Sequence, residues 1–289
     1  MKRLLIVLSA VVLTLITSAP VFADEGQRTD EDQGTGQYLA LGDSVAFGFT
    51  PPEVTPVAKY FNAANFIGYP EMVAAETELK DNNASCAGEA TGGFISLAST
   101  NDNGCLTGYR RNFPLHVAYT TSQLDYAVHF LKTHRNTKLV TINLGANDVF
   151  HQLDLCNNNP TCFGTALPGV LKTIKHNLQH IFGALRAAGY HGQIVALTYY
   201  ALDYGPGQTA GTIELNQTMI DAAKGFHVRI ASGFDAFAPL AKAHGGSACA
   251  AHLIILLPSG KCDVHPTQLG HSLLADAILD TISHGGGDN

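Results

Sequence analysis

The chain has 289 residues, of which 46% are apolar and 14% charged, and its formal net charge is −7 at pH 7. This length and apolar content suit one domain with a sizeable core. The acidic balance, without a basic cluster, argues against nucleic acid or an anionic membrane as a partner.

The first 23 residues differ in character from the rest. Lys2 and Arg3 form a short basic start, residues 4–16 are almost wholly apolar, and Val21-Phe22-Ala23 places small residues where signal peptidase cleaves. This apolar run is too short for a comfortable membrane span, and no later run is long enough. We therefore predict a signal peptide removed near Ala23, with an uncleaved anchor as the alternative. Removal of the signal peptide would change the net charge from −7 to −9. We expect the mature protein to be secreted and not stably inserted in a membrane.

Residues 24–37 are acidic and nearly free of apolar side chains, and we predict a disordered linker there. The folded domain is expected to span residues 38–284, followed by a flexible tail at 285–289. Residues 50–68 carry three prolines and several aromatic residues, and they predict a long apolar loop. Such a loop forms either the lip of a substrate site or a segment packed on the core.

Strands and helices alternate along the domain. Short apolar runs predict strands at 38–41, 139–144, 194–198 and 228–231, and a further short strand is expected at 82–84. Apolar residues at helical spacing predict helices at 70–79, 123–134, 166–188, 213–224 and 269–282. This alternation is typical of right-handed βαβ units around a parallel sheet of about five strands, covered on both faces. A further apolar segment at 253–257 is expected to be a buried strand, with a patch aimed at lipid as the alternative.

The six cysteines fit an exported protein, in which disulfides are far commoner than metal sites. They allow 15 pairings, and the sequence does not choose among them, although the spacing suggests three short loops between neighbours. No pair has the two-residue spacing of a zinc knuckle, and we expect neither a metal nor a cofactor. The six are Cys86, Cys105, Cys156, Cys162, Cys249 and Cys262.

Polar residues follow three of the predicted strands. Ser44 comes directly after the first strand, Gly88 lies in a turn after the second, and Asn147 follows the third. Because the carboxyl ends of parallel strands share one edge of a sheet, these residues can converge. Near the end of the chain, His265 follows Asp263 by two residues and lies just before the last predicted helix, for which Pro266 suits the first position. A serine, a histidine and a nearby carboxylate are what nucleophilic acyl transfer requires.

Four signatures therefore occur in order along the chain. They are Gly42-Asp43-Ser44, Cys86-Ala87-Gly88-Glu89, Gly145-Ala146-Asn147-Asp148 and Asp263-Val264-His265-Pro266. In this order, over residues 38–283, they resemble the SGNH/GDSL hydrolase superfamily of esterases and lipases, in particular its secreted, disulfide-bearing members. The absence of Gly-x-Ser-x-Gly around Ser44 argues against the α/β-hydrolase fold. We expect a single three-layer α/β/α flavodoxin-like domain.

The resemblance implies a role for each matching residue. Ser44 would be the nucleophile and would donate its backbone N–H to the oxyanion, together with the N–H of Gly88 and the side chain of Asn147. His265 would act as general base and then acid, oriented by Asp263. The superfamily's commonest pattern places the acid three residues before the histidine, where this chain has a cysteine. A backbone carbonyl is therefore the alternative partner of His265, with Asp263 capping the last helix.

These residues predict a secreted, monomeric serine ester hydrolase that cleaves acyl or lipid esters through an acyl-enzyme at Ser44, without a cofactor. Its substrate would be a small-molecule or lipid ester, and we expect no nucleic-acid partner. One alternative is a carbohydrate O-acetyl esterase with the same site. An alternative of another class is a non-catalytic extracellular binding module on the same fold.

Overall fold

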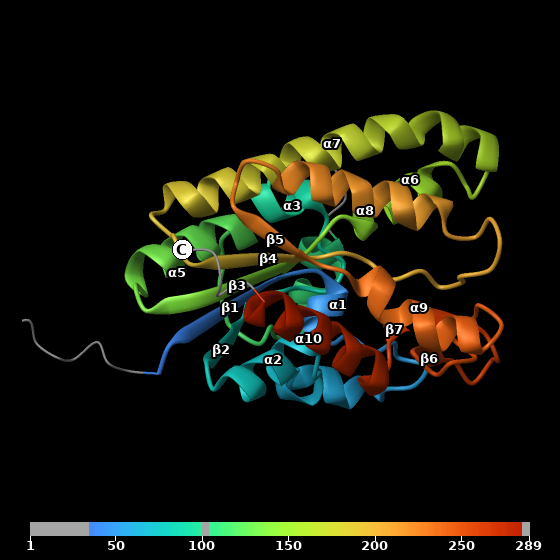
Figure 1. The fold of residues 1–289 in the computed structure, drawn as a ribbon, viewed down its shortest axis with the longest axis horizontal. Helices are drawn as coiled ribbons and strands as arrows, with labels where there is room; N and C mark the ends of the chain where they lie inside the picture. The colour runs from blue at the N-terminus through green and yellow to red at the C-terminus, as the bar shows by residue number, and fades with distance from the viewer. Residues whose placement is uncertain (1–34, 100–103, 285–289) are drawn as a thin grey trace, which may run out of the picture. The chain divides into compact units, whose positions relative to one another are not determined.

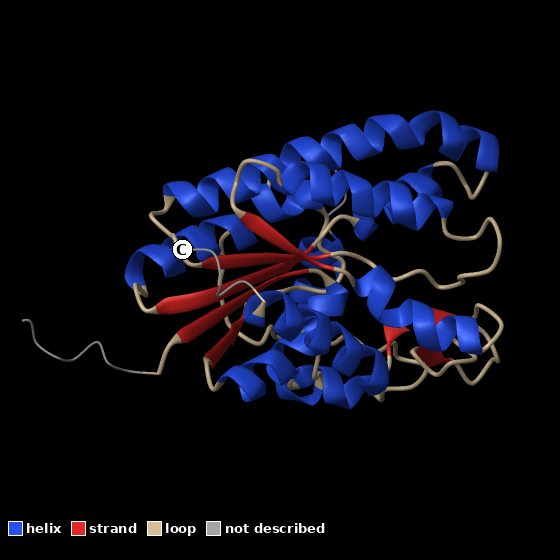
Figure 2. Ribbon diagram, viewed as in Figure 1, coloured by secondary structure: helices blue, strands red, loops and turns tan. Residues whose placement is uncertain are grey.

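The computed structural model describes residues 35–99 and 104–284 (Figures 1 and 2). The predicted signal peptide, most of the predicted linker and the predicted tail lie outside these residues. The strands are β1 (Gln37–Gly42), β2 (Lys80–Asn83), β3 (Thr137–Asn143), β4 (Gln193–Leu197), β5 (Val228–Ala231), β6 (Ile254–Leu256) and β7 (Cys262–Pro266). The helices are α1 (Ser44–Phe47), α2 (Tyr69–Thr77), α3 (Thr91–Ile95), α4 (Arg110–Asn112), α5 (Gln123–Thr133), α6 (Ala146–Leu155), α7 (Pro160–Ala187), α8 (Ala210–Ala223), α9 (Gly233–Ala243) and α10 (Gln268–Ser283). Shorter helical segments are η2 (Val57–Phe61), η3 (Ala63–Asn65) and η4 (Cys105–Tyr109).

Five strands form one parallel sheet in the order β2-β1-β3-β4-β5. The predicted fold class, a three-layer α/β/α domain with a parallel sheet, is therefore confirmed. In this flavodoxin-like order the chain direction along the sheet reverses between β1 and β3, and such switch points are where α/β sheets bind ligands. Ser44 follows β1 and Asn147 follows β3, so both lie at the switch point.

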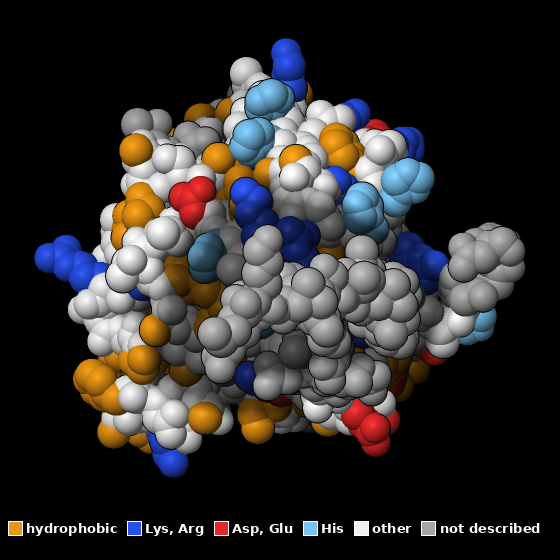
Figure 3. All heavy atoms as spheres, turned by 90° about the vertical axis from the view of Figure 1, so that its left-hand side faces the viewer, with side chains coloured by type: hydrophobic (Ala, Val, Ile, Leu, Met, Phe, Trp, Pro, Cys, Tyr) orange, Lys and Arg blue, Asp and Glu red, His pale blue; other side chains and the backbone are white. Residues whose placement is uncertain are grey.

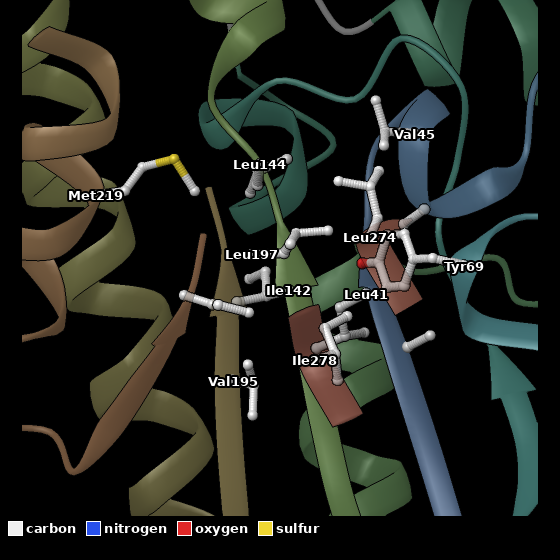
Figure 4. Packing of buried hydrophobic residues seen from close by; sticks show 14 of the residues in the cluster. Leu41, Val45, Tyr69, Ile142, Leu144, Val195, Leu197, Met219, Leu274 and Ile278 are labelled. Carbon is white, nitrogen blue, oxygen red and sulfur yellow. The ribbon is translucent and has the colours of Figure 1, made fainter. Parts of the chain in front are cut away.

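Helices cover both faces of the sheet (Figure 1). The helices α5, α7 and α8 lie on one face, and α2 and α10 lie on the other. Figure 4 shows side chains of the central strands packed among Met219 of α8 and Leu274 and Ile278 of α10. Because both faces are buried, the central strands are almost continuously apolar, which is why their sequences are easy to recognise.

Helix α7 begins six residues earlier than the predicted start at residue 166. The side chain of Asn159 accepts hydrogen bonds from the backbone N–H groups of Thr161 and Cys162, and Pro160 takes the first helical position. This cap fixes the start of the helix, whereas the apolar periodicity begins only at residue 166. Pro168 lies inside the helix and does not end it.

The segment at 253–257 contributes β6, which pairs with β7 in a separate antiparallel hairpin. Leu253 and Ile254 are buried, as expected, whereas Leu256 is 53% exposed. The prediction that Pro266 opens the last helix is wrong, because Pro266 ends β7. Thr267 instead caps α10, accepting a hydrogen bond from the Gly270 N–H.

Three disulfides join the six cysteines as sequence neighbours. The pairs are Cys86–Cys105, Cys156–Cys162 and Cys249–Cys262. The first closes a loop that begins beside Gly88, and the third ties β7 to the segment before β6. Two of the disulfides therefore brace segments that carry predicted site residues.

Figure 3 shows the end of the sheet at which the strands begin. Where described side chains are visible, lysine and arginine are spread among neutral and apolar residues and do not gather into one patch. In residues 35–99 and 104–284, none of the helices combines the length and the apolar character that a bilayer crossing requires.

Candidate active site

A tight turn at the end of β1 presents Ser44. Gly42 has φ +138°, and a Cβ there would lie 2.2 Å from the carbonyl oxygen of Asn143 in β3. Only glycine fits this close approach of two strands. Asp43 then caps α1, its Oδ1 accepting from the Val45 N–H at 3.0 Å. Ser44 is thus the first residue of a helical turn, where backbone N–H groups are available to a ligand.

The turn after β2 presents the backbone of Gly88. Gly88 has φ +83°, and a Cβ there would lie 2.8 Å from the backbone of Gly104. The disulfide between Cys86 and Cys105 holds these two segments together. Gly88 lines the same cavity as Ser44, Asn147 and His265.

Asn147 lies in the first turn of α6, directly after the turn that ends β3. Its Nδ2 donates a hydrogen bond to the carbonyl oxygen of Glu89 at 3.0 Å. A side-chain amide has two N–H groups, so one remains for a ligand in the cavity. The bond also ties Asn147 to the turn that carries Gly88.

His265 is held by Asp263. Its Nδ1 lies 2.5 Å from Asp263 Oδ1, and its backbone N–H donates to the same oxygen at 2.9 Å. The shorter spacing is therefore compatible with an Asp–His pair, because the aspartate side chain folds back over two residues of β7. Asp263 does not cap α10, since Thr267 does.

The environment of this pair favours an ionised aspartate. Burial alone would raise the pKa of Asp263, but its hydrogen bond to His265 and the charge of that residue outweigh burial, and the pKa lies below its usual value. Phe49 packs against the imidazole of His265 with ring centroids 4.8 Å apart. The imidazole is thus restrained both by a carboxylate and by an aromatic ring.

Two cavities meet at Ser44, Asn147 and His265, and both are lined by all three residues. The first, of about 340 Å³, extends toward α6 and α8 and is here called the α8 arm. Its other lining residues are Asp43, Val45, Ala146, Val149, Phe150, Tyr199, Tyr200, Leu202, Gly211, Thr212, Leu215 and Val264. The second, of about 560 Å³, is here called the lip arm. Its other lining residues are Phe49, Pro52, Val57, Tyr60, Ala87, Gly88, Gly108, Tyr109, Asn112 and Phe113.

The loop at residues 50–68 satisfies both expectations for it. Pro52, Val57 and Tyr60 line the lip arm, while Phe66 is buried in a cluster with Phe47. Part of the loop is therefore a wall of the cleft and part is core.

Sequence reasoning missed two residues that organise the site. Gln123, fully buried at the start of α5, accepts from the Gly42 N–H at 2.6 Å and donates to the Gly42 carbonyl at 3.1 Å. Tyr199, after β4, donates its hydroxyl to Asp43 Oδ2 at 2.5 Å. A polar residue at the start of a helix and a tyrosine after a strand are common, so neither has a local signal.

Asp43 and Asp148, interpreted from the sequence as structural, are buried hydrogen-bond acceptors. Burial raises the pKa of Asp43 to about 6, against the effect of its bonds from Tyr199 and Val45. Asp148 accepts from the backbone and the hydroxyl of Thr91, at 2.9 and 2.6 Å, and burial raises its pKa as well. Both carboxylates join loops at the edge of the sheet.

A model of the GDSL-like lipase/acylhydrolase family matches residues 40–273, most of the chain. The chain belongs to this family. It is therefore a carboxylic ester hydrolase. No curated protein matches the sequence of this family member.

Solved structures share the fold of this GDSL-like hydrolase at 16% identity. They include an extracellular lipase from Streptomyces rimosus, with a TM-score of 0.55 over 86% of this chain and 100% of the lipase. A phospholipase A1 from Streptomyces albidoflavus NA297 has a TM-score of 0.56 over 86% and 99% of the two chains. A carbohydrate acetylesterase from Sinorhizobium meliloti has a TM-score of 0.51 over 86% and 99%. Identity at this level shows the fold alone.

Proposed function

We propose that this GDSL-like hydrolase is a secreted esterase or lipase that cleaves acyl or lipid esters through an acyl-enzyme at Ser44. The observation that carries the proposal is the bond between His265 Nδ1 and Asp263 Oδ1, in a cleft that His265 shares with Ser44. This bond selects the imidazole tautomer in which Nε2 accepts a proton. The three disulfides support secretion, because such bonds persist outside the reducing cytosol.

In the acylation step, Ser44 Oγ attacks the ester carbonyl carbon while His265 Nε2 takes the hydroxyl proton. The carbonyl oxygen becomes an oxyanion, which the N–H groups of Ser44 and Gly88 and the amide of Asn147 stabilise. The bond to the leaving oxygen then breaks, and His265 gives its proton to the departing alcohol. Asp263 stabilises the imidazolium between these two transfers.

In the deacylation step, water takes the place of the alcohol. His265 removes a proton from the water as the water oxygen attacks the acyl carbon. The second tetrahedral intermediate collapses by breaking the bond to Ser44 Oγ, which regains the proton from His265. The carboxylic acid is released, and the enzyme returns to its starting state.

The α8 arm supports an acyl chain longer than acetyl as the substrate's acid part. Its walls include Val149, Phe150, Leu202 and Leu215, and its volume of about 340 Å³ is that of a small ligand pocket. The lip arm, which includes the exposed polar side chain of Asn112, suits the alcohol part. A carbohydrate acetylesterase with the same catalytic residues remains the second candidate, and the alternative of a binding module has no support in an enzyme family.

A chain-length series of p-nitrophenyl esters tests the substrate class. Each methylene buried in an apolar arm contributes about 0.8 kcal/mol, so kcat/KM is expected to rise by up to about fourfold per methylene from acetate upward. The rise should end when the arm is full. Turnover of acetate alone would instead favour the carbohydrate acetylesterase.

Gly211→Leu is expected to shorten the preferred acyl chain. Gly211 lines the α8 arm, and a Cβ there would meet nothing within 4 Å, so a larger side chain fits without strain. The variant should lose kcat/KM on long esters by about tenfold, the effect of roughly two methylenes left unburied, and should keep acetate turnover. Gly108→Leu is the matched control, since Gly108 lines the lip arm with the same free space. An unchanged profile in Gly211→Leu would place the acyl chain elsewhere.

Asn147→Ala is expected to lower kcat by roughly 10²–10³ with little change in KM, because it removes one donor to the oxyanion. Steady-state kinetics on the preferred ester measure the loss. Asn82→Ala is the control, since Asn82 also donates side-chain hydrogen bonds, but to Gln37 and Tyr38 at the start of β1, and it lines neither arm. A loss of less than fivefold in Asn147→Ala would remove this residue from the oxyanion hole.

A further inference from the structure

One buried hydroxyl connects the turns that follow three neighbouring strands. Tyr199, 7% exposed after the end of β4, donates to Asp43 Oδ2 at 2.5 Å. The hydroxyl oxygen of Tyr199 in turn accepts the backbone N–H of Ala146 at 3.2 Å. Asp43 precedes Ser44, and Ala146 precedes Asn147. The hydroxyl therefore lies between the residue that carries one oxyanion donor and the residue that carries another.

Tyr199 is itself held in place by its main chain. Its N–H donates to Asn216 Oδ1 at 2.8 Å, and Asn216 Nδ2 donates back to its carbonyl oxygen at 2.7 Å. Asn216 is buried in α8. Because the side-chain amide of Asn216 binds both the N–H and the carbonyl of Tyr199, it fixes the position of the tyrosine ring between α8 and the edge of the sheet.

The arrangement extends to the third oxyanion turn. Asn147 is bonded to the carbonyl of Glu89, the residue after Gly88. On the other side, Asp43 Oδ1 accepts from the Val45 N–H and so orients the helical turn that contains Ser44. Each of the three donors thus belongs to a segment that is linked, directly or through one further bond, to the Tyr199 hydroxyl.

We propose that Tyr199 is a positioning residue of the oxyanion hole, whose hydroxyl fixes the Ser44 turn and the Asn147 turn relative to each other. The inference rests on the proposed function, because it assigns a role toward the oxyanion formed at Ser44. Lining the wall of the α8 arm would require only the ring of Tyr199, whereas the proposed role accounts for its buried hydroxyl. Oxyanion stabilisation depends on donors that are already aligned, so a small change in their spacing lowers the rate.

Tyr199→Phe keeps the ring and removes only the hydroxyl. We expect kcat to fall by roughly tenfold to a hundredfold, less than the loss of a whole donor, with KM changed by less than about twofold. An alkyl trifluoromethyl ketone, to which Ser44 Oγ adds to form a hemiketal oxyanion, should bind more weakly by the same factor. The losses in kcat and in ketone affinity are both measured on folded protein, and the concentration of active sites is determined by titration.

Tyr204→Phe is the matched control. The Tyr204 hydroxyl also donates one hydrogen bond, to the carbonyl of Phe234 at 2.8 Å, and accepts one backbone N–H, from Ala201 at 3.1 Å. It is nearly as buried, at 9% exposed, but does not line either arm. If Tyr199 has a purely structural role, both variants should lower the melting temperature alike and leave kcat and ketone affinity unchanged. That result would overturn the proposal.

The double variant Tyr199→Phe with Asn147→Ala supplies a second criterion. If Tyr199 acts through the Asn147 turn, its removal should cost less than threefold in kcat once Asn147 is alanine. Full additivity would overturn the proposal. The variant Asn216→Ala keeps the hydroxyl of Tyr199 but frees its main chain, and it should show the same losses in kcat and in ketone affinity. It replaces Tyr199→Phe as the test if that variant does not fold. Failure of the wild type to form a hemiketal at Ser44 would instead count against the proposed function.

Discussion

Replacing Ser44 with alanine is expected to lower kcat by roughly 10⁴–10⁶, the range seen when a catalytic triad loses its nucleophile. Without Oγ no acyl-enzyme forms, and the oxyanion donors can assist only the attack of water. KM should change little, since both arms of the cleft keep their walls. Steady-state hydrolysis of a p-nitrophenyl ester by purified protein measures the effect.

Ser272→Ala is the control for this substitution. Ser272 is on α10, away from both arms, and its hydroxyl donates to the Leu269 carbonyl at 2.8 Å, so its loss should leave kcat within about twofold. If Ser44→Ala and Ser272→Ala hydrolyse the ester at the wild-type rate, the nucleophile lies elsewhere and the mechanism proposed above is wrong.

Asp263→Asn is expected to lower kcat by about 10⁴, because an amide donates to Nδ1 and so selects the imidazole tautomer that cannot accept the serine proton. The same change should leave the fold intact, since asparagine keeps the size and shape of the side chain and Asp263 is only partly buried. The measurement is kcat across neutral pH, with the melting temperature recorded for each protein.

Asp203→Asn is a matched control. Asp203 Oδ1 accepts the backbone N–H of Gly205, two residues on, just as Asp263 accepts that of His265, but Asp203 lies outside both arms of the cleft. Its kcat should be unchanged. A loss of less than about tenfold in Asp263→Asn would show that the carboxylate is dispensable and that His265 is oriented by another group.

The central strands of the main sheet, β1, β3 and β4, were predictable because both of their faces are buried. Their apolar runs and the helical periodicity between them were sufficient to predict the layers of the domain. Helix α9 was missed, although Ser232 followed by Asp235 is a local capping signal and the Ser232 hydroxyl does accept from the Asp235 N–H. Helix α1 was missed because a single turn is too short to show periodicity.

The site was only partly predictable, for a different reason. The motifs identified residues at loop positions, but the groups that hold those loops lie far away in the sequence. Tyr199 is 156 residues from Asp43, and Gln123 is 81 residues from Gly42. Nothing local distinguishes such residues. The spacing between Asp263 and His265 was also ambiguous until the backbone of β7 showed that the carboxylate reaches the imidazole.

Covalent trapping tests the central claim most directly. An alkyl fluorophosphonate reacts when a serine oxygen attacks phosphorus and fluoride leaves, and the adduct is mapped by mass spectrometry of the digested protein. The mechanism predicts one adduct per chain, on Ser44, formed slowly in Asp263→Asn and not formed in Ser44→Ala. An adduct on another residue, or ester hydrolysis that continues with Ser44 unmodified, would contradict it.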